Sequence, residues 1–149
     1  MEFPSRFKNN ASASIGLVFI KAYNAWHTQI KRKLSELGVT HPQFVLMTTI
    51  AYLSQKDEHI SQASAARMAN MDAMSVSQIA RSLIKGGYIS RLDNPNDTRS
   101  YALYLTEKGG EVVKAALPVV EAIDDEFFGK LGDEKRRFLE LLHRLVETN

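Results

Sequence analysis

A short amphipathic segment, followed closely by a polar turn between two apolar runs, constrains the fold of this chain more than any other feature. Over residues 75–85, apolar side chains recur at intervals of three and four, and polar side chains fill the opposite face. This spacing predicts a short helix, which Gly86-Gly87 would end. Apolar residues then alternate over 88–92 and 100–105, with the polar segment 93–99 between them. We therefore predict a helix followed by a small β-hairpin with a basic residue at its tip.

The length and composition suit one domain with a core of ordinary size. The chain has 149 residues, of which 44% are hydrophobic, and this is too short for two ordinary domains. The absence of Cys excludes disulfides and thiolate metal sites and suits a reducing compartment. We also see neither a secretory leader nor an apolar run of about 18 residues. We therefore expect a cytoplasmic protein that does not contact membranes.

The distribution of charge is more informative than the net charge of +2. Residues 1–110 carry 13 basic and 8 acidic side chains, whereas residues 111–149 carry 6 basic and 9 acidic ones. Phosphate groups attract the first segment and repel the second. Contacts with nucleic acid are therefore expected from the first 110 residues.

Long helices are predicted near both ends of the chain. From about 11 to 37, apolar residues recur at spacings of three and four, and Gly38 would end this helix. A second helical region covers about 107–147. It begins at Thr106 with Glu107, runs to around Phe128, and is followed by a last amphipathic helix.

The segment of about 40–106 reads as a separate lobe with a helix-turn-helix. Thr40 and Gln43 form the pattern of a capping box, in which Pro42 suits the first turn. Ser61 can cap the next helix, and a tight turn at 70–72 would join it to the helix that begins at about Ser75. Two short helices joined in this way, the second polar on its outside, are typical of DNA-binding proteins.

Several pieces of this lobe occur in a recognisable order. They are Thr40 with Gln43-Phe44, Ser75-Val76-Ser77, Gly87-Tyr88-Ile89 with Arg91, Pro95 with Asp97-x-Arg99, and Leu105-Thr106-x-Lys108-Gly109. The set, from about Val39 to Gly109, resembles the MarR family of winged helix-turn-helix transcriptional regulators. The resemblance implies a mainly α fold, with a two-stranded β-wing and long N- and C-terminal dimerisation helices, in one domain covering 1–149. It also implies a homodimer that binds a pseudo-palindromic DNA operator and releases it when a small molecule binds, and it favours repression over activation.

Three positions depart from the usual pattern of that family. Met74 stands where a small polar capping residue is common, Gln78 where a basic residue is common, and Arg81 where an acidic one is common. These departures concern the operator sequence more than the activity.

The expected DNA contacts come from the second short helix and from the hairpin. On the helix they are Ser75, Ser77, Gln78, Arg81 and Lys85, and at the hairpin tip Asn96, Thr98 and Arg99. Gln78 suits adenine, Arg81 suits guanine or a phosphate, and Arg99 suits a narrow minor groove. Asp97 is expected to shape the wing by pairing with Arg99 or Arg91. The alternatives are an ordinary solvated helix face and an exposed ion pair of small energetic value.

Aromatic side chains near the first two helices suggest an effector site. The resemblance implies a cavity between the dimer base and the DNA-reading lobe, where Tyr23, Trp26, His41 and Phe44 would fall. A small aromatic or apolar acid is the expected effector. Ordinary core or dimer packing is the alternative explanation for each of these residues.

Other classes of function have weaker support. No nucleophile motif or phosphate-binding Gly loop occurs, so we expect neither catalysis nor a cofactor. The four His residues, 27, 41, 59 and 143, have no metal-ligand spacing, although folding can gather distant ligands into a zinc-responsive site. A winged helix used only for protein interaction, without sequence-specific DNA binding, is the remaining alternative, beside an enzyme that uses the effector cavity.

Overall fold

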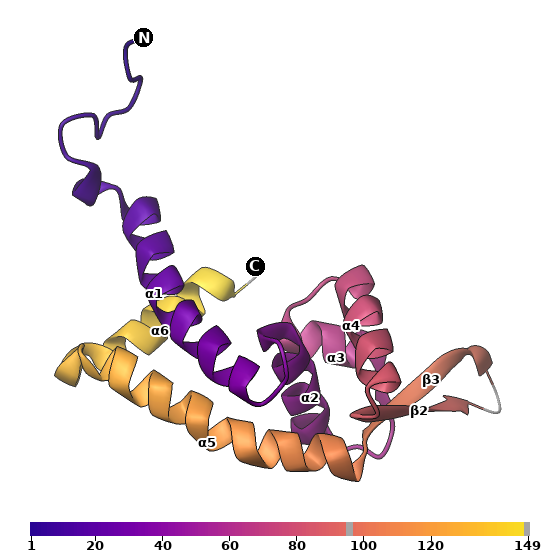
Figure 1. Cartoon of the computed structure of the whole chain (residues 1–149). Coiled ribbons are helices and arrows are strands. Elements are labelled where there is room, and N and C mark those ends of the chain that lie inside the picture. Colours follow the sequence, from indigo (N-terminus) through magenta and orange to yellow (C-terminus); the bar gives the residue numbers. More distant parts are fainter. Residues whose placement is uncertain (95–96, 148–149) are drawn as a thin grey trace. The chain divides into compact units, whose positions relative to one another are not determined.

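The structure is a computed structural model, which describes the backbone of residues 1–94 and 97–147 and the side chains of 1–93 and 101–147. Its elements are α1 (Ile15–Glu36), α2 (His41–Leu53), β1 (Ile60–Ser61), α3 (Gln62–Ala69), α4 (Ala73–Lys85), β2 (Ile89–Asn94), β3 (Asp97–Leu105), α5 (Glu107–Gly129) and α6 (Lys135–Val146), with 3-10 turns at Ala11–Ala13 and Gly132–Glu134 (Figure 1). The fold is mainly helical, as expected. The chain forms two compact units: a terminal unit of Met1–Ile30 with Glu121–Asn149, and a central unit of Lys31–Val120.

The capping box predicted at the start of α2 is present. The Gln43 amide N–H donates to the Thr40 hydroxyl oxygen at 3.3 Å, and the Thr40 amide N–H donates to the Gln43 side chain at 2.9 Å. These two bonds satisfy donors that the first helical turn would otherwise leave unpaired. The helix then buries Phe44, Met47 and Ile50 in the core of the central unit.

The helix-turn-helix consists of α3 and α4, joined at Asn70-Met71-Asp72. Ser61 caps α3 through the Ser64 amide, as expected. Asn70 ends α3 with a φ of +51°, in the left-handed region that Asn tolerates better than most residues. The helix predicted from Ser75 begins two residues earlier, at Ala73, because the Asp72 side chain accepts from the Ser75 amide at 2.8 Å.

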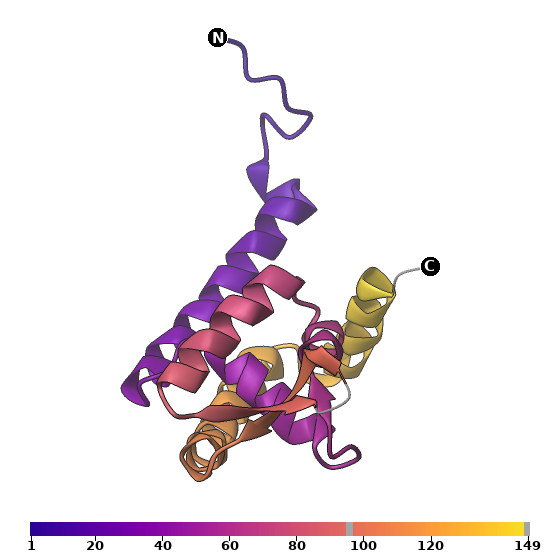
Figure 2. The ribbon, with the colours of Figure 1, turned by 90° about the vertical axis from the view of Figure 1, so that its right-hand side faces the viewer.

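The wing is part of a three-stranded antiparallel sheet in the order β1-β3-β2. The predicted strands are present and longer than expected, and β2 and β3 lie side by side in Figure 1 and Figure 2. The third strand was not predicted: Ile60 and Ser61 pair with Leu103 and Ala102. Ile60, Ile89 and Leu103 are buried, so this small sheet contributes directly to the core of the central unit.

The terminal unit contains most of α1, the end of α5 and all of α6. The indole N–H of Trp26 donates to Asp124 at 2.7 Å and so joins α1 to α5. None of the residues of α6 is buried. Many large apolar side chains of this unit are exposed, among them Ile15, Val18, Phe19, Ile20, Leu139, Leu145 and Val146. The terminal unit therefore leaves a large amount of apolar surface uncovered in the single chain.

Candidate nucleic-acid interface

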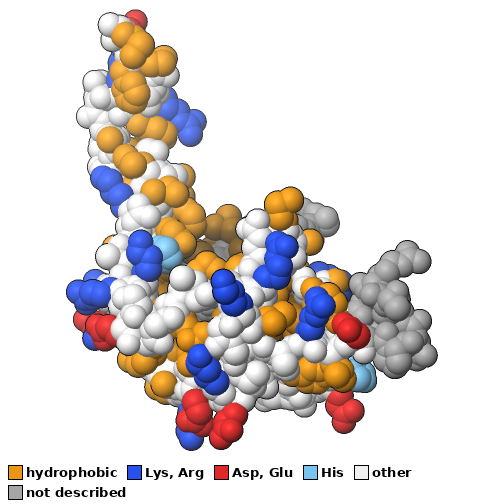
Figure 3. All heavy atoms as spheres, turned by 45° about the vertical axis from the view of Figure 1, so that its right-hand side comes forward, with side chains coloured by type: hydrophobic (Ala, Val, Ile, Leu, Met, Phe, Trp, Pro, Cys, Tyr) orange, Lys and Arg blue, Asp and Glu red, His pale blue; other side chains and the backbone are white. Residues whose placement is uncertain are grey.

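The two faces of α4 differ sharply in chemistry. Val76, Ala80 and Leu83 are fully buried and fix the helix against the rest of the central unit. The opposite side is exposed, and it carries Met74, Gln78, Arg81, Ser82 and Lys85. Figure 3 shows separate Lys and Arg side chains reaching the surface on one face of the molecule. An exposed helix face with amide, guanidinium and ammonium groups can donate hydrogen bonds both to base edges and to phosphates.

Two of the predicted DNA contacts, Ser75 and Ser77, are only half-exposed. The Ser75 hydroxyl donates to the Asp72 carboxylate at 2.6 Å, in addition to the capping bond from its amide. This hydroxyl keeps acceptor capacity and has its proton engaged. Among the predicted residues on α4, Gln78, Arg81 and Lys85 are the exposed ones, and their side chains carry hydrogen-bond donors.

The carboxylate of Asp72 is held in its ionised form at the start of α4. Hydrogen bonds from the hydroxyl and then the amide of Ser75 lower the pKa of Asp72 below its usual value of 3.8. A negative charge also interacts favourably with the positive end of the helix dipole. The first turn of α4 is thus capped from within the chain, a function of Asp72 that the sequence analysis missed.

The start of α2 also contacts the exposed face of α4. The Gln43 side-chain amide donates to the Ser82 hydroxyl at 2.8 Å. Gln43 therefore takes part in the capping box and in a contact with the helix that carries the predicted DNA contacts. One residue of the recognised sequence pattern thus connects the two elements.

A cluster at the end of α4, which we call the α4–α5 clamp, consists of Gly86, Tyr88, Thr106, Lys108 and Gly109. The Lys108 ammonium donates to the Gly86 carbonyl at 2.7 Å and lies 4.3 Å from the centre of the Tyr88 ring. The Thr106 amide donates to the Tyr88 carbonyl at 3.1 Å, and the Thr106 hydroxyl accepts from the Gly109 amide at the same distance. A cation beside the last carbonyls of a helix is favoured by the helix dipole.

Gly109 completes the α4–α5 clamp by close approach of two backbones. A Cβ atom at this position would overlap the carbonyl oxygen of Tyr88. Only a residue without a side chain allows α5 to begin so near to the chain that leaves α4. Contacts with Gly86 and Tyr88, in the segment between α4 and β2, therefore account for Thr106, Lys108 and Gly109 of the motif.

The wing is described in part. Arg91, on β2, lies with its Nε 3.9 Å from a carboxylate oxygen of Asp93 and with its guanidinium 4.9 Å from the centre of the Tyr101 ring. The expected Asn96 contact lies outside the described residues. The side chains of Asp97, Thr98 and Arg99 also lie outside the described part, although their backbone belongs to β3. The pairing of Asp97 and the groove contact of Arg99 stay predictions.

The four predicted effector residues fall in different units. Tyr23 and Trp26 belong to the terminal unit, whereas His41 and Phe44 belong to the central unit. The ring of Tyr23 lies 6.0 Å from that of Trp26, and the ring of His41 lies 6.5 Å from that of Phe44. Phe44 is only 5% exposed and is a core residue of its own unit.

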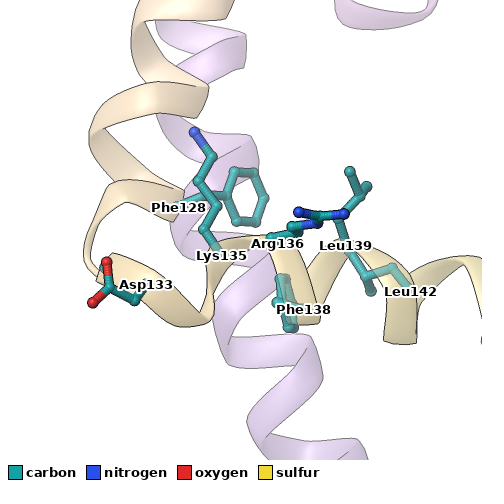
Figure 4. A pocket seen from close by; sticks show the side chains of 8 residues that line it. Phe128, Asp133, Lys135, Arg136, Phe138, Leu139 and Leu142 are labelled. Carbon is teal, nitrogen blue, oxygen red and sulfur yellow. The ribbon is translucent and has the colours of Figure 1, made fainter.

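Two apolar hollows occur within the terminal unit. One, of about 430 Å³, is lined by residues that include Phe19, Trp26 and Lys130. The other, of about 500 Å³, lies beside α6 and is lined by Phe128, Asp133, Lys135, Arg136, Phe138, Leu139 and Leu142, which Figure 4 labels. The two hollows share Phe128, Phe138 and Leu142. Tyr23 and Trp26, two of the predicted effector residues, line the first hollow. None of the predicted effector residues lines the second.

No group of three or more His, Asp and Glu side chains in the described part of the chain is placed to hold a metal ion. Among those same residues, no helix combines the length and the apolar character needed to cross a membrane.

Comparison with known proteins identifies relatives over nearly the whole chain. A family model described as "ArnR1-like, winged-helix domain" matches residues 35–123. The HTH-type transcriptional regulator YdcH of Bacillus subtilis is 39% identical over 147 residues, which is 99% of each chain. Among solved structures, a mutant of E. coli MarR in complex with operator DNA has a TM-score of 0.79, with 21% identity over 96% of this chain and 99% of that chain. BpsR of Bordetella bronchiseptica, described as regulated in its DNA binding by 6-hydroxynicotinic acid, has a TM-score of 0.78, with 21% identity over 89% of this chain and 98% of that chain.

The helix-turn-helix, the β-wing and these relatives define a DNA-binding transcriptional regulator of the winged-helix class, which is a class of non-enzymatic proteins. Within that class, the chain belongs to the ArnR1-like winged-helix family, and it has the fold of MarR of E. coli.

Proposed function

We propose that this regulator is a homodimeric repressor, which binds a pseudo-palindromic operator in the cytoplasm and releases it when a small aromatic or apolar acid binds. Its two copies of α4 would enter successive major grooves, about 34 Å apart. The observation that carries this proposal is the exposed face of α4, where Gln78, Arg81 and Lys85 stand opposite a fully buried apolar face. The MarR structure in complex with operator DNA supports the same use of the fold.

The exposed apolar surface of the terminal unit supports the dimer. Both α1 and α6 carry large apolar side chains that the single chain leaves in water, including Phe19 and Leu145. Each such side chain stabilises an interface by about 1.5–3 kcal/mol when it is fully buried. A second copy, bringing the same helices, is the simplest partner for such a surface, since homodimers are built from self-complementary patches.

Release by a ligand requires two conformations of the dimer. An effector would bind better to the dimer in which the two copies of α4 are wrongly spaced, and only its differential affinity can shift the equilibrium. The response of BpsR to 6-hydroxynicotinic acid supports an aromatic acid as the class of effector. Tyr23 and Trp26, which line one hollow of the terminal unit, are the residues proposed for its site.

The proposal is tested by selecting bound sequences from a randomised duplex pool, followed by anisotropy titration at two salt concentrations. We expect an enriched inverted repeat. Weak, salt-sensitive binding without enrichment would instead favour a protein-interaction module, and affinity that changes with zinc and reverses with a chelator would favour a metal-responsive regulator.

Two variants test, in the same experiment, whether Gln78 and Arg99 contact the DNA. Gln78→Ala is expected to change the preferred bases at one position of each half-site, because an amide reads adenine through paired hydrogen bonds. Arg99→Ala is expected to weaken binding to all sequences with an A·T-rich flank. An unchanged sequence preference would remove Gln78 from the reading set, and unchanged affinity at moderate salt would remove Arg99.

A further inference from the structure

The exposed face of α4 contains one large apolar side chain. Met74 is 72% exposed and is the second residue of the helix. Successive residues of an α-helix are turned by about 100°, so residues four and seven positions after it share its side. Those residues are Gln78 and Arg81, and Lys85 follows on the same side. Met74 therefore belongs to the stripe that faces DNA in the proposed function.

Single exposed apolar residues are common and need no special explanation. Met68, on α3 of the same unit, is 52% exposed and is an example. What distinguishes Met74 is its place. The N-terminal residues of a recognition helix are the ones that approach base edges in the major groove, and Met74 occupies that end of the stripe.

The surroundings of Met74 favour a base edge over a phosphate. Asp72, two residues before it, already accepts the amide N–H of Ser75 and carries a negative charge. A phosphate at this end of α4 would meet both a repelling carboxylate and a turn whose donors are partly used. The start of α4 is thus poorly suited to the DNA backbone.

A Met side chain has no strong hydrogen-bonding group, and the one apolar group in the major groove is the C5-methyl group of thymine. Its flexible, polarisable thioether adapts to small apolar partners. We propose that Met74 is a specificity-determining residue, which contacts the thymine methyl group at one position in each operator half-site. This inference rests on the proposed function, since it requires α4 to enter the major groove.

The test uses the duplex that the full-length protein selects from a randomised pool. Each thymine of the two half-sites is replaced in turn by deoxyuridine, which removes only the methyl group. Binding is then measured for the unaltered protein, for Met74→Ala and for Met68→Ala, which is the matched control on α3. Circular dichroism checks that each variant keeps its helical content.

At one symmetric position, we expect loss of the methyl group to weaken binding by the unaltered protein and by Met68→Ala about fourfold for each half-site. Met74→Ala is expected to bind the thymine and deoxyuridine duplexes equally and to select sequences without a preference at that position. If Met74→Ala keeps both the sequence preference and the sensitivity to deoxyuridine, or if no methyl group matters to the unaltered protein, the inference is wrong. Failure of the unaltered protein to enrich any sequence would overturn the proposed function as well.

Discussion

Gly109 and Gly110 are neighbours in the first turns of α5, and only one of them is required by packing. The position of a Cβ at Gly109 overlaps the backbone of Tyr88, whereas a Cβ at Gly110 meets nothing within 4 Å. Glycine is therefore required by steric contact at position 109, whereas at position 110 it only lowers the stability of the helix.

Substitution of these two residues is expected to change stability in opposite directions. Gly109→Ala should lower the free energy of unfolding by more than about 2 kcal/mol, because a backbone oxygen cannot move aside as a flexible side chain can. Gly110→Ala should raise it by up to about 1 kcal/mol, because Ala favours the helical conformation. Chemical denaturation of both variants provides the measurement, and a Gly109→Ala protein as stable as Gly110→Ala would contradict the described backbone contact.

A second residue-scale prediction concerns pH. Because the pKa of Asp72 is lower in the folded protein than in the unfolded chain, its contribution to stability is present above its usual pKa of 3.8. That contribution is lost as the pH falls through the lower, folded value. Denaturation at neutral and acidic pH should therefore show a stability difference between the unaltered protein and Asp72→Ala that shrinks as the pH falls below 3.8. A difference that stays constant over this range would show that the ionised carboxylate is not what caps α4.

At the scale of elements, the α4–α5 clamp connects the DNA-facing helix to the beginning of α5. The Lys108 ammonium bonds to the carbonyl of Gly86, which directly follows the end of α4. The Lys108 ammonium thus stabilises the end of α4, although Lys108 is not part of the exposed face of that helix. Its effect on DNA binding should come through the position of α4.

We expect Lys108→Met to lower the free energy of unfolding by about 1 kcal/mol and to weaken operator binding. The dependence of binding on salt should stay unchanged, because Lys108 is not expected to neutralise a phosphate. Lys114→Met, which removes an exposed charge from the same helix, is the matched control and should change stability by less than about 0.5 kcal/mol. A salt slope reduced by about one unit in Lys108→Met would identify Lys108 as a phosphate contact instead.

Local sequence patterns predicted the elements well and their long-range contacts poorly. The capping box at Thr40 and the helix cap at Ser61 are local signals, and both are present. The strand Ile60–Ser61 is too short to show alternation, so only its partner in β3 reveals it. The contact between Lys108 and Gly86 joins residues 22 positions apart.

For the candidate site too, local patterns were predicted correctly and long-range contacts were missed. Periodicity correctly placed Gln78 and Arg81 on the exposed face of α4. Met74 was left out because the helix was expected to begin at Ser75, and the cap that moves its start to Ala73 is formed by Asp72. Most of the clamp residues were recognised as a pattern, but their contacts depend on how the beginning of α5 packs against the segment that follows α4.

At the scale of the whole molecule, the two units have contrasting surfaces. The central unit buries large apolar residues such as Leu46, Ile50 and Leu83 completely, and Tyr52, Met68, Met74 and Leu92 are its exposed ones among the described residues. The terminal unit exposes many of its own, and α6 buries none of its residues. The terminal unit would therefore bury more apolar surface than the central unit in the proposed dimer.

Introducing a charge on α6 should break the proposed dimer. Leu145 is 78% exposed in the single chain, and we expect Leu145→Glu to weaken self-association at least tenfold, because a carboxylate would lose its hydration in the interface. Leu92→Glu is the control, since Leu92 is also largely exposed and lies on β2 of the central unit. Sedimentation across a range of concentrations gives the measurement. Equal dimer fractions in the two variants would exclude α6 from the interface.

The single tryptophan, Trp26, which donates a hydrogen bond to Asp124, is an intrinsic fluorescence probe of the terminal unit. Trp26 lies in the terminal unit within 6.5 Å of the Phe128 ring centre. Four of the five tyrosines, 52, 88, 101 and 104, belong to the central unit. Indole emission therefore arises from the terminal unit alone. Its colour and intensity follow the environment of α1 and α5 without a dye, a tag or an engineered residue.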